Sequence, residues 1–102
     1  MSEWVKVMNK SDVPRGTGSI VELGDKQVAV FCVEGQYYAI DNICPHRGGP
    51  LGEGDLEGTV VTCPWHGWEF DVTTGQSPIN PSACVKRFDV KIEGDDVFVQ
   101  LD

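Results

Sequence analysis

The sequence lacks a long hydrophobic run and an excess of basic residues, and both absences exclude classes of function. No apolar stretch in its 102 residues approaches the roughly 20 residues that span a bilayer. The first residues lack the basic and apolar regions of a signal peptide. The formal net charge of −8 argues against nucleic acid, whose partners are basic. We therefore expect a cytoplasmic protein with no membrane and no nucleic acid among its partners.

Helical periodicity is nearly absent as well, and alternation of apolar and polar residues dominates. Twelve glycines and six prolines mark many turns between the alternating stretches. These stretches predict strands at 4–8, 19–23, 27–33, 36–40, 59–62, 68–72, 85–93 and 97–101, whereas residues 51–58 are expected to be irregular. Many short strands at close spacing predict an all-β fold, an antiparallel sandwich or small barrel. The length predicts one domain, 1–102.

The last two predicted strands form a hairpin with one buried face. Phe88, Val90 and Ile92 alternate with charged residues, so they should point to the same side of the strand. That side is expected to pack on the core of an antiparallel sheet.

Cysteine and histidine are scarce, yet they occur in two close pairs. Cys44 and His46 are separated by one residue, and Cys63 and His66 by two, with sixteen residues between the pairs. Thiolate sulfur and neutral imidazole nitrogen are good ligands for zinc and for iron–sulfur clusters. The four residues could also lie in a hydrophobic core by chance. The proline and glycine that flank both pairs argue against this. A structural Cys2His2 zinc site usually pairs Cys with Cys and His with His, whereas both pairs here are mixed.

The two segments, CPHRGGPL at 44–51 and CPWHGWEFD at 63–71, resemble the cluster-binding boxes of the Rieske 2Fe–2S family, C-x-H-x-G and C-x-x-H-G. The resemblance extends over nearly the whole chain. It implies that Cys44 and Cys63 bind one iron and that His46 and His66 bind the other, as in Rieske centres. It also implies a β base domain carrying a small inserted cluster-binding subdomain, here at about 41–75.

The resemblance also predicts a low reduction potential. High-potential respiratory members carry a second cysteine in each box, at positions that match Gly49 and Trp65 here. They also carry Ser and Tyr hydroxyls that donate toward the cluster sulfurs, at positions that match Trp68 and Phe70. Without these groups, we expect a midpoint near the low end of the Rieske range of roughly −150 to +300 mV.

Several other residues have competing interpretations. Cys32 and Cys84 are expected to be two separate buried thiols, although a bond between them is possible. Trp65 is either an exposed docking contact or a wedge against residues 78–81. Arg47 either braces the first loop or meets a partner's carboxylate. The glycines at 48, 49 and 67 are expected to let the backbone approach the cluster, since a Cβ would crowd it.

No nucleophile, general base or substrate pocket stands out, so the chain is expected not to be an enzyme. The resemblance implies a monomeric ferredoxin that takes one electron from an NAD(P)H-dependent flavin reductase and passes it to a terminal oxygenase. One alternative is the small Rieske-like subunit that binds the large subunit of an NAD(P)H nitrite reductase. A further alternative is a zinc-stabilised binding module. The acidic charge fits a carrier that docks on basic patches, but it equally fits mere solubility.

Overall fold

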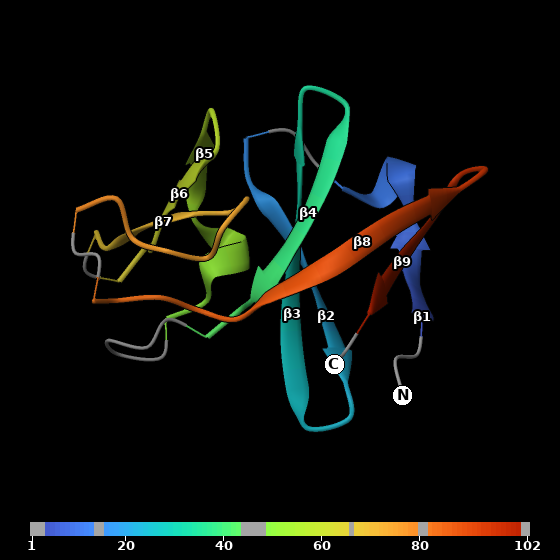
Figure 1. Cartoon of the computed structure of the whole chain (residues 1–102), viewed down its shortest axis with the longest axis horizontal. Coiled ribbons are helices and arrows are strands. Elements are labelled where there is room, and N and C mark those ends of the chain that lie inside the picture. The colour runs from blue at the N-terminus through green and yellow to red at the C-terminus, as the bar shows by residue number, and fades with distance from the viewer. Residues whose placement is uncertain (1–3, 14–15, 44–48, 66, 80–81, 101–102) are drawn as a thin grey trace.

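Two antiparallel sheets make up the computed structural model, which describes residues 4–13, 16–43, 49–65, 67–79 and 82–100 (Figure 1). The strands are β1 (Trp4–Asn9), β2 (Gly18–Leu23), β3 (Lys26–Val33), β4 (Gln36–Asp41), β5 (Asp55–Glu57), β6 (Val60–Thr62), β7 (Glu69–Asp71), β8 (Arg87–Glu93) and β9 (Asp96–Gln100). Two 3-10 turns, η1 (Lys10–Asp12) and η2 (Leu51–Glu53), complete the assigned elements. None of the described helices is long and apolar enough to cross a membrane.

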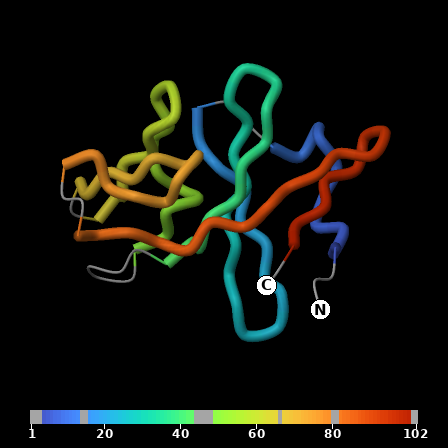
Figure 2. The backbone as a smooth tube through the Cα atoms, in the orientation of Figure 1, coloured from blue at the N-terminus to red at the C-terminus, as the bar shows by residue number. Residues whose placement is uncertain are grey.

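The larger sheet has six strands in the order β1-β9-β8-β4-β3-β2, and the smaller sheet has three in the order β5-β6-β7. Figure 2 shows the small sheet beside the large one, with the chain entering it after β4 and leaving it before β8. The all-β prediction, an antiparallel sandwich or barrel with a smaller inserted unit, is therefore confirmed. The precise subdomain bounds of 41–75 stay a prediction.

The β3–β4 hairpin illustrates how local sequence sets the sheet. Glu34 and Gly35 connect the strands, with φ angles of 49° and 83°. Two successive residues with positive φ are typical of a type I′ turn, whose twist matches that of the flanking strands. The resulting register pairs Cys32 with Tyr37 and Val28 with Asp41. It fixes the end of β4, which the first predicted ligand box follows after two intervening residues.

The core consists of two packed groups of side chains. One joins the large sheet to the small one and contains Ala29, Phe31, Ile40, Leu51, Val61, Cys63, Phe70 and Val72. The other lies on the large sheet, where Val13 after η1 packs with strand residues, and contains Val13, Val28, Val30, Ala39, Phe88, Val97 and Val99. Cys63, a predicted ligand, is thus a member of the group that holds the two sheets together.

Two local predictions are wrong. Residues 51–58 are not irregular: η2 begins at the fully buried Leu51, and β5 forms because it pairs with β6. The β8 face that begins with Phe88 is not buried along its length, since Phe88 is 3% exposed and Ile92 is 38% exposed. Phe88 lies where β8 pairs with β4, whereas the described pairing at Ile92 is with β9 alone. Alternation therefore predicted the strand correctly but not how far the core extends along it.

Candidate metal centre

The two predicted ligand boxes lie on either side of β5 and β6 along the chain. The first follows β4, and the second connects β6 to β7. Cys63 lies in the part of the chain that the structure describes. The other predicted ligands, Cys44, His46 and His66, and also Arg47, lie outside the described residues.

The two ends of the first loop are held side by side. Ile43 and Pro50 form an isolated antiparallel bridge. The Leu51 N–H donates to the Asn42 carbonyl at 2.7 Å. Because these contacts join the residues just before and just after the first box, that box is closed at its base like a hairpin.

The second loop is closed by its own backbone. The Cys63 N–H donates to the Trp68 carbonyl at 2.6 Å, and the Gly67 N–H donates to the Cys63 carbonyl at 3.1 Å. Gly67 has a φ of +73°, and a Cβ there would meet nothing within 4 Å. Glycine is favoured at Gly67 by its left-handed backbone. That a side chain there would crowd the cluster stays a prediction.

Gly49 brings the two loops into contact. A Cβ on Gly49 would lie 2.7 Å from the Cys63 Sγ and 3.0 Å from the Trp65 Cγ. The first distance is too short for carbon and sulfur, so the Gly49 backbone can approach Cys63 only because it has no side chain. That a Cβ on Gly49 would also crowd the cluster stays a prediction, and Gly48 lies outside the described residues.

The environment of Cys63 fits a cluster ligand. Its thiol is unbonded and only 2% exposed, and it packs in the same core group as Val61 and Phe70. Because Cys63 is a buried free thiol next to Gly49, its sulfur is available to bind a metal. The apolar side chains packed around Cys63 exclude water from that side of the sulfur. The described residues alone gather no three metal-binding side chains, which follows from three of the four predicted ligands lying outside them.

The other two described cysteines are separate thiols, as predicted. Cys32 is half-buried on β3, and Cys84 is exposed. The prediction that both are buried is wrong: Cys32 is only partly covered, and Cys84 precedes β8 in a surface segment that bridges to Gln76. An isolated cysteine before an alternating stretch gave no signal of its exposure.

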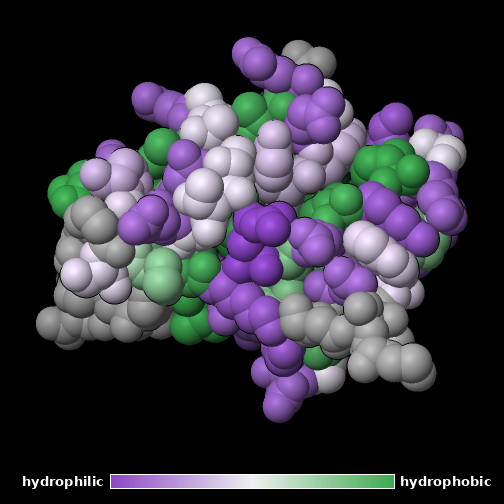
Figure 3. All heavy atoms as spheres, viewed as in Figure 1, coloured by the Kyte–Doolittle hydropathy of each residue, from purple (hydrophilic) through white to green (hydrophobic). Residues whose placement is uncertain are grey.

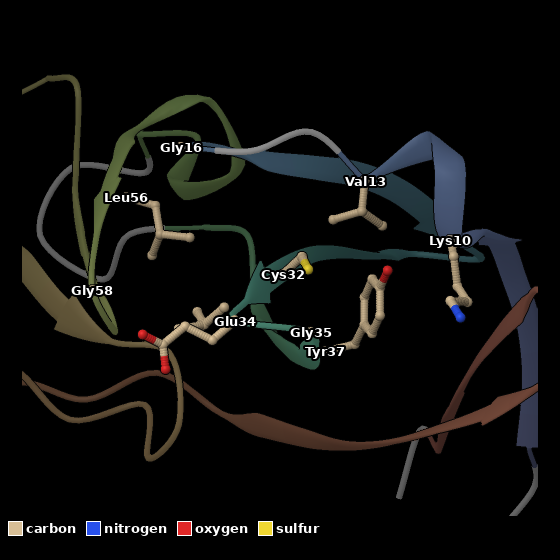
Figure 4. Close-up of a pocket in the computed structure, with 10 residues that line it drawn as sticks. Lys10, Val13, Gly16, Cys32, Glu34, Gly35, Tyr37, Leu56 and Gly58 are labelled. Carbon is tan, nitrogen blue, oxygen red and sulfur yellow. The ribbon is translucent and has the colours of Figure 1, made fainter.

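A hollow of about 740 Å³ lies at the opposite end of β4 from the first ligand loop (Figure 4). The side chains of Cys32 and Tyr37 contribute to its wall, with Leu56 across from them. Burial raises the pKa of the Tyr37 hydroxyl, and its hydrogen bond to Cys32 raises that pKa further. Tyr37 lies near the far end of β4 from the first ligand loop, and β4 is six residues long, or roughly 20 Å. Leu56, in contrast, pairs with Val61 of β6, two residues before Cys63. Tyr37 and Tyr38 both lie in β4, as expected of sheet residues.

Comparison with known proteins places this all-β chain in the class of small iron–sulfur proteins. The Rieske [2Fe-2S] domain family matches residues 3–89. The ferredoxin component of the naphthalene 1,2-dioxygenase system of Pseudomonas aeruginosa is 36% identical over 100 residues, which cover 97% of this chain and 96% of that protein. The chain belongs to the Rieske [2Fe-2S] domain family, and its cofactor is a Rieske-type 2Fe–2S cluster.

Solved structures support the same assignment. A complex of reduced oxygenase and oxidized ferredoxin in carbazole 1,9a-dioxygenase contains a chain that matches with a TM-score of 0.84 and 37% identity, over 94% of this chain and 91% of that one. A putative NADH-dependent nitrite reductase small subunit from Mycobacterium tuberculosis matches with a TM-score of 0.91 and 21% identity, over 100% of this chain and 97% of that one. The second likeness shows the fold alone.

Proposed function

We propose that this chain is a Rieske-type ferredoxin, a one-electron carrier that receives an electron from an NAD(P)H-dependent flavin reductase and delivers it to a terminal oxygenase. The observation that carries the proposal is the contact of Gly49 with Cys63, which brings the two ligand boxes together. The relatives named above as ferredoxin components match over nearly their whole length, so this chain is an electron-transfer component and not itself an enzyme. We further propose that it works as a cytoplasmic monomer, because a shuttling carrier must leave one partner to reach the next.

We propose that Cys44 and Cys63 hold one iron and that His46 and His66 hold the other, within a cluster-binding subdomain at about 41–75. When bound, such a cluster stores one electron, and replacing two thiolates by neutral imidazoles makes its reduction easier. The chain's own contribution is to keep Cys63 buried against Phe70 and Val61. Phe70 is fully buried and has no hydroxyl to donate toward the cluster, which supports the low potential predicted from the sequence.

Exposed apolar side chains next to both boxes support a docking face for the oxygenase. Ile43 directly precedes the first box and is 41% exposed, and Trp65 lies within the second box and is 57% exposed. Ile79 is 70% exposed and lines a hollow of about 340 Å³ together with Gly67 and Trp68. Large apolar groups exposed in one region favour protein contact. We therefore prefer the docking interpretation of Trp65 over the wedge.

The acidic side chains in and near the small sheet also support docking on a basic surface. The sequence from Gly48 to Val85 contains no Lys or Arg, whereas it contains Glu53, Asp55, Glu57, Glu69 and Asp71. Three of these five, those at 53, 55 and 57, are exposed. In Figure 3, hydrophilic side chains cover much of the middle of the face in view, and hydrophobic ones appear in several separate patches among and beside them. A negative field near the metal centre would speed encounter with a positively charged partner.

Replacement of Trp65 by alanine is expected to slow electron delivery to the oxygenase by about 10- to 100-fold, because buried interface tryptophans commonly contribute about 2 kcal/mol or more. The midpoint potential should stay the same, since the indole is not a ligand. Stopped-flow oxidation of the reduced ferredoxin by the oxygenase measures the rate. Trp4→Ala is the matched control, because Trp4 is also exposed, at 38%, but lies on β1 of the large sheet. Equal slowing by both variants would contradict the docking face.

The function itself is tested by reductive titration of anaerobically purified protein with EPR and visible spectra. We expect a red-brown protein, a rhombic EPR signal on reduction, and a midpoint below about 0 mV, in the lower half of the Rieske range. A colourless protein that accepts no electron would refute the proposal and leave the zinc-stabilised module. Tight co-purification with a large sirohaem subunit would instead favour the nitrite reductase alternative, which the fold also permits.

A further inference from the structure

Asn42 is a polar residue in an almost completely buried position, one residue after the end of β4. Asn42 is only 1% exposed. The Gly52 N–H donates to the Asn42 Oδ1 at 2.7 Å, and the Asn42 Nδ2 donates to the Gln27 Oε1 at 2.9 Å. Because a backbone N–H requires an acceptor, the contact with Gly52 also fixes which side-chain atom is the oxygen. Burying an amide is costly unless both ends are paired, and here both are.

The backbone of Asn42 makes two more hydrogen bonds, one to the same β3 residue and one to the same 3-10 turn, η2. Its N–H donates to the Gln27 carbonyl at 2.9 Å, and its carbonyl accepts the Leu51 N–H at 2.7 Å. Asn42 is therefore tied on one side to β3 of the large sheet and on the other side to η2. The two bonds to Leu51 and Gly52 join the two ends of residues 43–50, which contain the predicted ligands Cys44 and His46, and the two bonds to Gln27 attach these ends to β3.

The segment that Asn42 holds has little room to shift. A Cβ on Gly52 would overlap the Ile20 side chain and lie 3.0 Å from the Asn42 Oδ1. Leu51, the neighbour of Gly52, is fully buried in the core group that contains Cys63. Displacement of η2 would therefore change the packing beside Cys63 as well as the end of the first loop.

The clearance between the two loops is equally small, as the contact of Gly49 with the Cys63 Sγ shows. Gly49 lies three residues before Gly52, so it moves with the end of the loop that Asn42 holds. We propose that Asn42 is a positioning residue for the metal centre: it sets the first ligand loop against Cys63 before and while the cluster is bound. This inference rests on the ligand assignment proposed above.

Thr17 offers a matched control on the same segment. Its hydroxyl lies 3.1 Å from the Gly52 carbonyl and 2.7 Å from the Gly54 carbonyl. Thr17→Val removes these bonds at nearly constant volume, on the side of η2 that leads into β5 and away from the first ligand loop. Asn42→Leu removes the side-chain bonds to Gly52 and Gln27 with a side chain of similar size.

The experiment compares hydrogen exchange, cluster release to a chelator, and the EPR spectrum of the reduced holoprotein among the wild type, Asn42→Leu and Thr17→Val. In Asn42→Leu we expect peptides containing Leu51 and Gly52 to exchange roughly ten- to a hundredfold faster, as the loss of a buried hydrogen bond implies. Cluster release should accelerate by about tenfold or more, with shifted g-values. Thr17→Val should lose thermal stability yet release its cluster at the wild-type rate with unchanged g-values. Similar release rates and spectra in both variants would overturn the proposal, because Asn42 would then contribute to stability alone.

A milder variant covers the case in which Asn42→Leu does not fold. Gln27→Met removes the acceptor of the Asn42 Nδ2 but leaves the Gly52 contact in place, so we expect an intermediate acceleration of cluster release. Release at the wild-type rate would overturn the proposal.

Hydrogen exchange at Leu51 and Gly52 does not depend on which residues bind iron. A wild-type protein without a cluster would therefore refute the proposed function, whereas unchanged exchange in Asn42→Leu would refute the positioning role separately.

Discussion

Cys63→Ser is expected to yield a colourless protein without an EPR signal after reduction. Serine keeps the size of the side chain but replaces the thiolate with a hydroxyl, which stays protonated near neutral pH and is a poor ligand for an iron–sulfur cluster. The loss should be complete, because the remaining three predicted ligands cannot close the cluster. Iron and sulfide content, visible spectra and EPR of the anaerobically purified variant measure it.

The chain contains its own controls for this result. Cys32 and Cys84 are free thiols outside the two boxes, and replacing either by serine should leave a fully loaded, red-brown protein. Cys44→Ser is expected to behave like Cys63→Ser. Full loading of Cys63→Ser, or loss of the cluster in Cys32→Ser or Cys84→Ser, would contradict the ligand assignment.

Phe70→Ala is expected to lower the free energy of unfolding by about 3–5 kcal/mol, the usual cost of deleting a buried aromatic ring. Phe70 is fully buried in the core group that joins the two sheets, next to Cys63. A domain of this size is commonly stable by only about 5–15 kcal/mol, so the variant should unfold at a much lower urea concentration. It should also lose its cluster at low urea, because the cavity opens beside the ligand sulfur.

Urea unfolding of the holoprotein, followed by far-ultraviolet circular dichroism and by cluster absorbance, measures both effects. Phe98→Ala is the matched control, since Phe98 lies on β9 of the large sheet and is only half-buried. Phe98→Ala should lower the free energy of unfolding by about 1–2 kcal/mol, because Phe98 buries a smaller apolar area than Phe70 does. A cost for Phe70→Ala no larger than that for Phe98→Ala would show that the contact between the sheets contributes little to stability.

The strand pattern could be predicted from sequence because it depends on neighbours along the chain. Alternation over 19–23, 27–33 and 36–40 predicted β2, β3 and β4 to within about one residue at each end. The same pattern failed at Ile92, whose exposure depends on where β4 stops pairing with β8. It also missed β5, because three residues between glycines show no periodicity and pair only through the hydrogen bonds of β6.

By itself, the sequence determined the chemistry of the site. Two mixed pairs of cysteine and histidine, separated by one or two residues, predict a metal site with zinc or an iron–sulfur cluster, since a short loop delivers both ligands of a pair. The residues around the pairs resemble the Rieske boxes and favour the cluster. The acidic charge and the absence of a hydroxyl at Phe70 are likewise properties of single residues.

Only the tertiary structure decided how the two boxes meet and what holds them. Gly49 and Cys63 are fourteen residues apart, and Asn42 and Gly52 are ten apart. Their contacts depend on how the small sheet packs on the large one. No local pattern marks a buried asparagine or distinguishes a glycine required for close approach, such as Gly49, from one required for its φ angle, such as Gly67. These properties arise from packing between distant segments, which sequence periodicity does not encode.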